Sequence, residues 1–382
     1  MSDHADIREA VARLCGDFPG EYWRALDRRR AYPEEFVAAL AGAGYLAILI
    51  PEAYGGAGLG LGAACAVLEE IQKSGCNGGA CHAQMYTMAT LLTHGSKEQK
   101  RRYLPKIASS ELRLQAFAVT EPSSGTDTTR IRTTAQRIGN AYRVSGQKVF
   151  ISRTEHSDLM LLLARTTPRE QAAKPTDGMS VLLVDLRSAV GKGLTIKPLA
   201  TMMNHATTEL YFDGLEVPAE NLIGEEGKGF NYILDSMNAE RVLVAQECIG
   251  DGRWLLEKGV QYANERVVFG MPIGKNQAVQ FPLARAHVEL EAADLMARKA
   301  AALFDAGRPC GPEANMAKLL ASEATWHAAE AALQTHGGFG FASEYDIERK
   351  WRESRIYQTA PISTNLILAF VGQHVLGLPR SY

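Results

Sequence analysis

The sequence predicts an α+β protein built from three successive modules: a helical one, a strand-rich one and a second helical one. Three observations support this fold class. Apolar residues recur at helical spacing up to about residue 111, and short β-branched and aromatic runs divided by turns follow from 112 to about 217. From residue 229 onward, long tracts rich in Ala, Leu and Glu indicate helices again. Because helices on both sides of a strand-rich stretch are an unusual order for one core, we expect separate modules packed together.

The first module contains two clear helical segments, at 36–40 and 64–71, whose apolar residues share one helical face. The loop 51–60 between them leads into a formal GxGxxA pattern. This pattern consists of Gly58, Gly60 and Ala63. A dinucleotide-binding interpretation of it is weak, because a Pro-Glu-Ala-Tyr loop separates it from any preceding strand.

The second module is a series of short apolar runs whose spacing suits a compact sheet or barrel. The expected strands include 147–151, 159–163, 179–184 and 209–212. The stretch 166–178, rich in Pro, Thr and charge, is predicted to be an exposed loop. In the third module the longest expected helices are 281–305 and 313–334.

Bulk composition is that of an ordinary soluble globular protein, with 46% apolar and 22% charged residues and a net charge of −2. The absence of a basic excess argues against nucleic acid as the main partner. The six cysteines form no CxxC pair, so we expect reduced thiols and no metal site. Apolar runs are far shorter than the about 20 residues that cross a bilayer, and the acidic N-terminus is unlike a targeting peptide. We therefore expect a cytoplasmic protein without membrane attachment.

The most informative stretch is Ala118–Asp127, where a β-like run ends in a turn crowded with hydroxyl groups and one glycine. Such a loop can direct backbone N–H and hydroxyl groups at one ligand, although Ser, Thr, Pro and Gly also build plain surface turns. A second unusual segment, Gln-Thr-His-Gly-Gly-Phe-Gly-Phe, occupies 334–341. Together they resemble the two signature segments of the acyl-CoA dehydrogenase family of flavoproteins. The resemblance covers nearly the whole chain.

This resemblance implies a helical N-terminal domain (1–112), a middle β-domain of sheet or barrel type (113–222) and a C-terminal helical domain (223–382) that forms a four-helix bundle. It also implies FAD, held by the middle and C-terminal domains and shared between subunits of a homo-oligomer, either a dimer or a tetramer. The residues that match flavin contacts are Phe117, Val119, Thr120, Gly125, Thr126, Phe150, Ser152, Arg266, Phe269, Gln277, Gln334, Gly337, Gly338, Ser363 and Asn365. Arg266 suits the FAD pyrophosphate chemically, and Gly337 and Gly338 would allow the close approach of a dinucleotide to the backbone.

The family's reaction needs a carboxylate that removes the α-proton of an acyl thioester. Many members carry a glutamate just after an Ile-Tyr-Gln-like segment, but this chain has Pro361 there and no acidic residue between Arg355 and Tyr382. A minority, including isovaleryl- and long-chain-type enzymes, places the glutamate on an earlier helix, at the position of Glu240. On a helical wheel Glu240 shares its face with apolar residues, and burial would raise its pKa toward that of a working base. The alternative for Glu240 is a structural salt bridge.

Three residues match substrate contacts: Thr126, which also matches a flavin contact, Arg241 and Ile362. Proline has no N–H, so Pro361 cannot donate to the thioester carbonyl as the family's backbone does at this position. Either Ile362 supplies that donor or a flavin hydroxyl polarises the carbonyl. Arg241 matches an arginine that contacts the CoA portion, although it could equally pair with an acidic neighbour.

The resemblance therefore implies FAD-dependent α,β-dehydrogenation of an acyl-CoA to the trans-2-enoyl-CoA, with electrons passed to electron-transfer flavoprotein. A flavin-dependent monooxygenase on the same scaffold is the first alternative, and it needs no α-proton base. A non-catalytic member that binds an acyl-CoA or a partner is the second.

Overall fold

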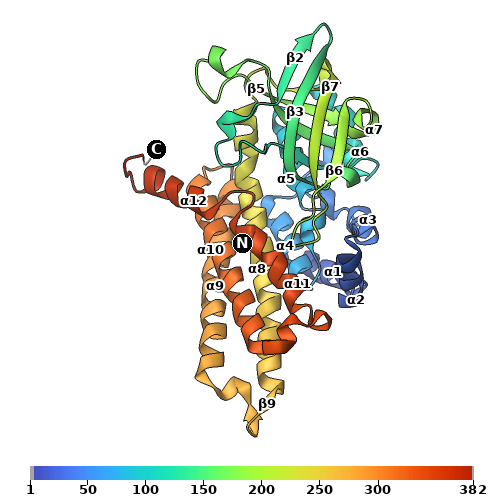
Figure 1. The fold of residues 1–382 in the computed structure, drawn as a ribbon. Coiled ribbons are helices and arrows are strands. Elements are labelled where there is room, and N and C mark those ends of the chain that lie inside the picture. Colours follow the sequence, from blue (N-terminus) through green and yellow to red (C-terminus); the bar gives the residue numbers. More distant parts are fainter. Residues whose placement is uncertain (1–3, 381–382) are drawn as a thin grey trace. The chain divides into compact units, whose positions relative to one another are not determined.

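The computed structural model describes residues 4–380, which divide into two compact units. Among the described residues, unit 1 consists of 4–29, 60–78 and 238–380, and unit 2 of 30–59 and 79–237. The predicted fold class is confirmed: helices come first, a sheet follows, and helices complete the chain (Figure 1). Within 4–380, no helix combines the length and apolarity that crossing a bilayer requires.

Unit 2 is built on an eight-stranded sheet with the order β6-β7-β3-β2-β4-β5-β8, and β1 pairs with β4 in parallel. Because β6 and β8 end this order without pairing to each other, the sheet is open and not a closed barrel. Its strands are β1 (Leu114–Ala118), β2 (Thr134–Ile138), β3 (Ala141–Ser152), β4 (Leu159–Arg165), β5 (Met179–Asp185), β6 (Leu194–Pro198), β7 (Thr207–Pro218) and β8 (Leu222–Ile223). Its helices are α3 (Glu34–Gly42), α5 (Ala83–His94), α6 (Lys97–Ala108) and the short α7 (Leu186–Ala189).

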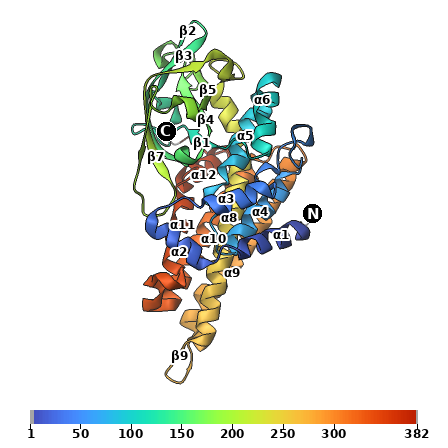
Figure 2. The same ribbon diagram turned by 90° about the vertical axis from the view of Figure 1, so that its right-hand side faces the viewer.

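Strand β4 explains how this sheet is stabilised. Every residue of β4 is buried, as its nearly continuous apolar sequence predicts for a central strand covered on both faces. Leu159, Leu161 and Leu163 pack into a core that includes side chains of α5 and α6, while Met160 and Leu162 enter a second core formed by the sheet itself. Side chains of a strand alternate between its two faces, so one strand supplies both cores. Figure 2 shows α5 and α6 beside the sheet.

Unit 1 is helical. Its elements are α1 (Ala5–Gly16), α2 (Gly20–Arg29), α4 (Leu61–Lys73), α9 (Gln277–Asp305), α10 (Gly311–His336), α11 (Ile347–Ser354), α12 (Thr364–Phe370) and most of α8 (Gly229–Glu265), which begins in unit 2. The hairpin of β9 (Val267–Val268) and β10 (Met271–Pro272) joins α8 to α9. No strand directly precedes α4, so Gly58, Gly60 and Ala63 lack the context of a dinucleotide-binding motif.

Alanines allow α8, α9 and α10 to pack closely. Ala293 and Ala297 of α9 and Ala317 and Ala321 of α10 are buried together with apolar side chains of α8. The spacing of four residues places each pair on one helical face, and the small side chains let the backbones approach. The three helices run side by side in both views (Figures 1 and 2).

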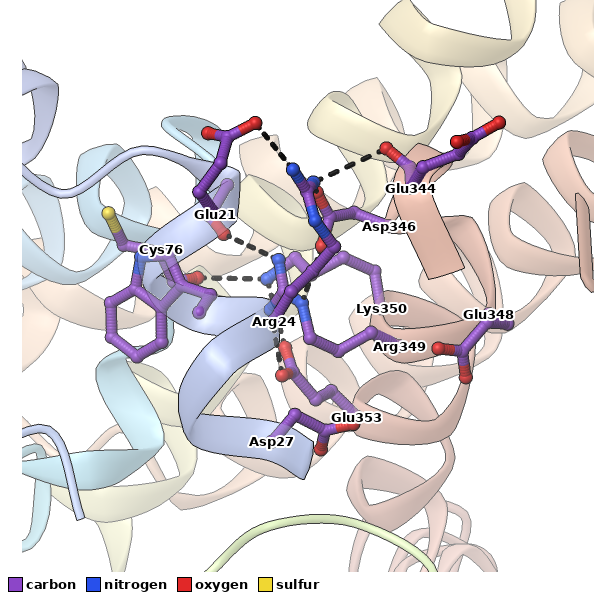
Figure 3. A network of polar contacts seen from close by, with 12 residues as sticks. Glu21, Arg24, Asp27, Cys76, Glu344, Asp346, Glu348, Arg349, Lys350 and Glu353 are labelled. Carbon is purple, nitrogen blue, oxygen red and sulfur yellow. Dashed lines mark hydrogen bonds and ion pairs between the residues drawn. The ribbon is translucent and has the colours of Figure 1, made fainter. Parts of the chain in front are cut away.

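A buried network of charges joins α11 to other parts of unit 1 (Figure 3). Lys350 is fully buried and lies 2.5 Å from Asp251 of α8, and it also donates to Glu353 (3.2 Å). Its remaining bonds go to the Gln72 side chain and the Cys76 carbonyl, both at 2.9 Å. Arg349 pairs with Glu353 and with Asp346, which in turn accepts from Arg24 of α2. A single lysine thus connects α4, α8 and α11.

Candidate functional site

A buried ion pair between Glu121 and Lys148 holds the loop that follows β1. Glu121 accepts from Lys148 (2.9 Å) and from the backbone N–H groups of Arg132 and Thr133, while Lys148 also donates to the Val119 carbonyl (2.8 Å). Burial lowers the pKa of Lys148 to about 8. Burial would raise the pKa of Glu121, but Lys148 and the hydrogen bonds hold that pKa below its usual value. The hydroxyl-rich turn is therefore held rigidly, and sequence reasoning did not identify this support.

The structure brings two of the matched flavin segments together in unit 2. The Val149 N–H donates to the Thr120 carbonyl (3.0 Å), which joins the first signature loop to the end of β3. Thr120 and Ser152 are half-buried, and their hydroxyls make no hydrogen bond with other residues in the described part of the chain. These hydroxyls retain their full capacity to bind a ligand.

Phe150 lies in an irregular stretch of the β3–β7 pairing, has a φ of 60° and is 63% exposed. An aromatic residue with positive φ costs about 1 kcal/mol or more, and such strain is found disproportionately at binding sites. The remaining matched residues of unit 2 lie close by in sequence. Phe117 is half-buried in β1, Gly125 and Thr126 are exposed, and a Cβ at Gly125 would meet no atom within 4 Å.

Besides Asn365, six matched residues of unit 1 are exposed on the single chain. Phe269 and Gly270 form the tip of the β9–β10 hairpin, both with positive φ, which is the geometry of a type I′ turn. The Phe269 side chain is 99% exposed. The Arg266 guanidinium lies 5.9 Å from the ring of Phe339, within the second signature segment. The other exposed matches are Gln277, Gln334, Gly337 and Gly338, and a Cβ at either glycine would meet nothing within 4 Å.

Glu240 is 6% exposed in α8, on the helical face that also carries the buried Leu243 and Val244. The side chain is therefore buried, as the helical wheel predicted. Lys318 of α10, which is fully buried, lies within electrostatic range of Glu240. Burial lowers the pKa of Lys318 to about 8, and the carboxylate of Glu240 is close enough to oppose that shift.

Lys318 connects this region to the segment that contains Pro361. Its Nζ donates to the Tyr357 carbonyl and to the Ile362 carbonyl, the latter at 2.6 Å. The Ala360–Pro361 peptide is cis. Within the described residues the Ile362 N–H makes no hydrogen bond, so it is available as a donor. The structure therefore gathers Glu240, Lys318 and Ile362 in one region of unit 1.

Arg241 is partly buried, and burial lowers its pKa. Its Nη1 donates to the Asn238 side chain one turn earlier (3.0 Å), whereas its buried Nε has no hydrogen-bond partner. A guanidinium with an unused donor suits an anionic ligand. Ser363 caps α12 by accepting from the Leu366 N–H (3.3 Å), and Asn365 is exposed in the first turn of that helix.

Lys318 is the site residue that sequence reasoning missed. A lysine is ordinarily expected at the surface. The available signal was its position on the Ala-rich face of α10, four residues after Ala314 and three before Ala321, both of which are buried.

Comparison with known proteins gives a consistent result along the chain. The models for the N-terminal, middle and C-terminal domains of acyl-CoA dehydrogenase match residues 1–111, 116–215 and 227–375. The chain is 35% identical to acyl-CoA dehydrogenase FadE12 of Mycobacterium tuberculosis, over 98% of this chain and 96% of that protein.

Two solved structures are also similar. One is described as the glutaryl-coenzyme A dehydrogenase glutaryl-CoA complex (TM-score 0.92, 30% identity, 100% of this chain and 97% of that chain). The other is described under electron transferring flavoprotein of Acidaminococcus fermentans and flavin-based electron bifurcation (TM-score 0.91, 30% identity, 98% of both chains).

Proposed function

The chain belongs to the acyl-CoA dehydrogenase family of FAD-dependent oxidoreductases, and from this premise we propose that it oxidises an acyl-CoA thioester to the trans-2-enoyl-CoA. Electrons then pass to electron-transfer flavoprotein, and the working form is a homo-oligomer. The domains in this proposal are 1–112, 113–222 and 223–382. The observation that carries the proposal is the buried carboxylate of Glu240 beside Lys318 and the Ile362 segment.

Several features of the chain suit FAD. The hydroxyls of Thr120 and Ser152 are unused, Phe150 presents an aromatic face under backbone strain, and Gly337 and Gly338 leave room for close approach. When bound, FAD supplies the acceptor for the hydride that leaves the β-carbon of the acyl group.

Glu240 acts as the base in this proposal. Its carboxylate takes the α-proton, the β-hydrogen leaves with its electron pair, and a Cα=Cβ double bond forms. The Glu240 side chain is 6% exposed, so the proton transfer would take place away from bulk water. No acidic residue between 355 and 382 competes for the role.

Two other residues would hold the thioester substrate. The free N–H of Ile362 is the donor proposed for the thioester carbonyl, where it would stabilise the negative charge that develops as the α-proton leaves. Arg241, with its unused Nε, is proposed to bind an anionic group of the CoA portion, and Thr126 is a further proposed contact.

The exposed hairpin supports a shared flavin site. A phenylalanine that is 99% exposed at the tip of a rigid turn would be costly if it remained in water in the working enzyme. We assign Arg266, Phe269, Gln277, Gln334, Gly337 and Gly338 to contacts with the flavin of a neighbouring subunit. A monooxygenase is less favoured, because that reaction has no use for Glu240.

The proposal is tested with the purified flavoprotein under anaerobic conditions. Its visible spectrum is recorded before and after a set of straight, branched and carboxylated acyl-CoAs is added. Bleaching of the flavin by at least one of them is expected. A flavin that binds but is bleached by none of these thioesters, and only by an external reductant, would contradict the proposed dehydrogenase activity.

A further inference from the structure

Lys318 occupies an unusual position for a cation. It is fully buried in the middle of α10, among the small apolar side chains through which α8, α9 and α10 pack. No carboxylate in the described part of the chain lies within 4.0 Å of its ammonium group. The ionisable groups nearest to it are Glu240, Arg241 and Cys248, all on α8. Burying an ammonium group without an ion pair is costly, so its other contacts must compensate.

Those contacts are two backbone carbonyls at the ends of one short segment. Lys318 donates to Tyr357 and to Ile362, which are 39 and 44 residues away along the chain. Hydrogen bonds from a cation to a carbonyl in an apolar region are among the stronger ones in proteins. The ammonium thus clamps the start and the end of 357–362 to the same point of α10.

Few backbone hydrogen bonds hold the end of this segment, at Pro361 and Ile362. Thr359 and Ala360 both donate to the Ile356 carbonyl, and the Ser363 carbonyl accepts from α12. Between them, Pro361 and Ile362 make no backbone–backbone hydrogen bond within the described residues. The bond from Lys318 to the Ile362 carbonyl therefore holds Ile362 itself, and with it the residue that carries the free N–H. The Tyr357 side chain has a separate anchor, since Gln72 donates to its hydroxyl (2.9 Å).

We infer that Lys318 is a positioning residue of the proposed dehydrogenation: it fixes the Tyr357–Ile362 segment so that the Ile362 N–H is held in place for the thioester. This inference rests on the proposed function. Lys318 touches neither substrate nor cofactor in it and acts through the backbone. Its charge is also within electrostatic range of Glu240, although the two groups form no ion pair among the described residues. Neither the family resemblance nor the matched motifs assigned a role to this lysine.

A test needs one readout of the segment and one of the chemistry. Lys318→Met keeps the length and apolar stem of the side chain but removes all three donors. Lys299→Met is the matched control, because Lys299 lies on the neighbouring helix α9, is exposed and pairs with Glu313 (3.2 Å). Both variants are prepared as flavin-loaded protein. Hydrogen exchange is followed in peptides covering 356–366, and flavin reduction is followed by rapid mixing with a bleaching acyl-CoA.

In Lys318→Met we expect exchange in 356–366 to be at least about 10-fold faster, because two buried hydrogen bonds are lost. We expect the rate constant of flavin reduction at saturating substrate to fall at least about 10-fold, while the half-saturating concentration changes by less than about 3-fold. The control should match wild type in both. If Lys318→Met does not fold, Lys318→Gln replaces it. The glutamine side chain has an N–H donor but is too short to reach both carbonyls, and the same thresholds apply.

Two results would overturn the inference. Faster exchange with an unchanged reduction rate would show that Lys318 only stabilises the fold, and a slower reduction with unchanged exchange would show that it does not act through the segment. If no acyl-CoA bleaches the wild-type flavin, the proposed function fails instead. The exchange comparison then still decides whether Lys318 holds the segment.

Discussion

Replacing Lys350 by methionine should destabilise the protein strongly, because it leaves Asp251 buried without its partner. Asp251 lies 2.5 Å from the Lys350 ammonium, and both side chains are fully buried. Within 4–380 neither carboxylate oxygen of Asp251 has another hydrogen-bond partner. Breaking a buried pair by removing one partner costs about 3–5 kcal/mol. Lys350 also donates to Gln72, Cys76 and Glu353, so the upper part of that range is expected.

The loss should depend on pH. Burial raises the pKa of Asp251 to about 6 even beside Lys350, and removing the ammonium group would raise that pKa further. At pH 5 the folded variant can therefore neutralise Asp251 by binding a proton. At pH 8 it must either keep a buried charge or bind a proton from a solution in which protons are scarce. Since the folded state binds the proton more tightly than the unfolded state, the variant loses stability as pH rises through this window.

Urea unfolding followed by far-UV circular dichroism at pH 5 and pH 8 measures both effects. Lys299→Met is the control, because its exposed pair with Glu313 should contribute less than about 1 kcal/mol. A loss for Lys350→Met at pH 8 that does not exceed the control would refute the reasoning. An equal loss at both pH values would refute the part that concerns Asp251.

Three further predictions concern other residues. Burial lowers the pKa of Lys318 to about 8, so between about pH 8 and 10.5 the unfolded state binds this proton more tightly than the folded state. The free energy of unfolding should therefore rise with pH in that window, by at most roughly 3 kcal/mol. Denaturation curves of Lys318→Met should lack this rise. Phe269→Ala should change the free energy of urea unfolding of the isolated chain by less than about 0.5 kcal/mol, since the side chain is 99% exposed. It should nevertheless lower the flavin content and the oligomer mass measured by size-exclusion light scattering. Unchanged flavin content and mass would count against a shared site. Phe150→Gly should raise the urea midpoint of unfolding of the flavin-free protein, because it relieves about 1 kcal/mol of positive-φ strain. The same variant should bind flavin more weakly. A lower midpoint would show that the Phe150 ring stabilises the fold.

The order of modules could be predicted from sequence because it depends on local periodicity. The apolar run at 159–163 identified β4, and the Ala-rich tracts identified α9 and α10. How the strands pair could not be predicted, since β1 pairs with β4 in parallel across more than forty residues and the spacing of strands is the same in an open sheet and a barrel. Pairing is decided by non-local contacts that leave no pattern in any one segment.

The same division applies to the candidate site. The burial of Glu240 could be predicted because its neighbours at helical spacing are apolar, which is a local pattern. The burial of Lys350 and Lys148 could not, because their charges are compensated by partners distant in sequence. Lys318 shares an Ala-rich helical face, but no local pattern indicates the backbone carbonyls that compensate its charge. A lysine in the sequence does not indicate whether distant partners will compensate its charge in the folded protein.

The most direct test of the proposed chemistry is anaerobic flavin reduction by Glu240→Gln, compared with wild type on the acyl-CoA that bleaches wild type best. Glutamine keeps the shape and polarity of the side chain but cannot accept the α-proton. Loss of a general base should lower the rate constant of flavin reduction by about 100-fold or more, with flavin content unchanged. Reduction near the wild-type rate with FAD still bound would contradict the assignment of Glu240 as the base.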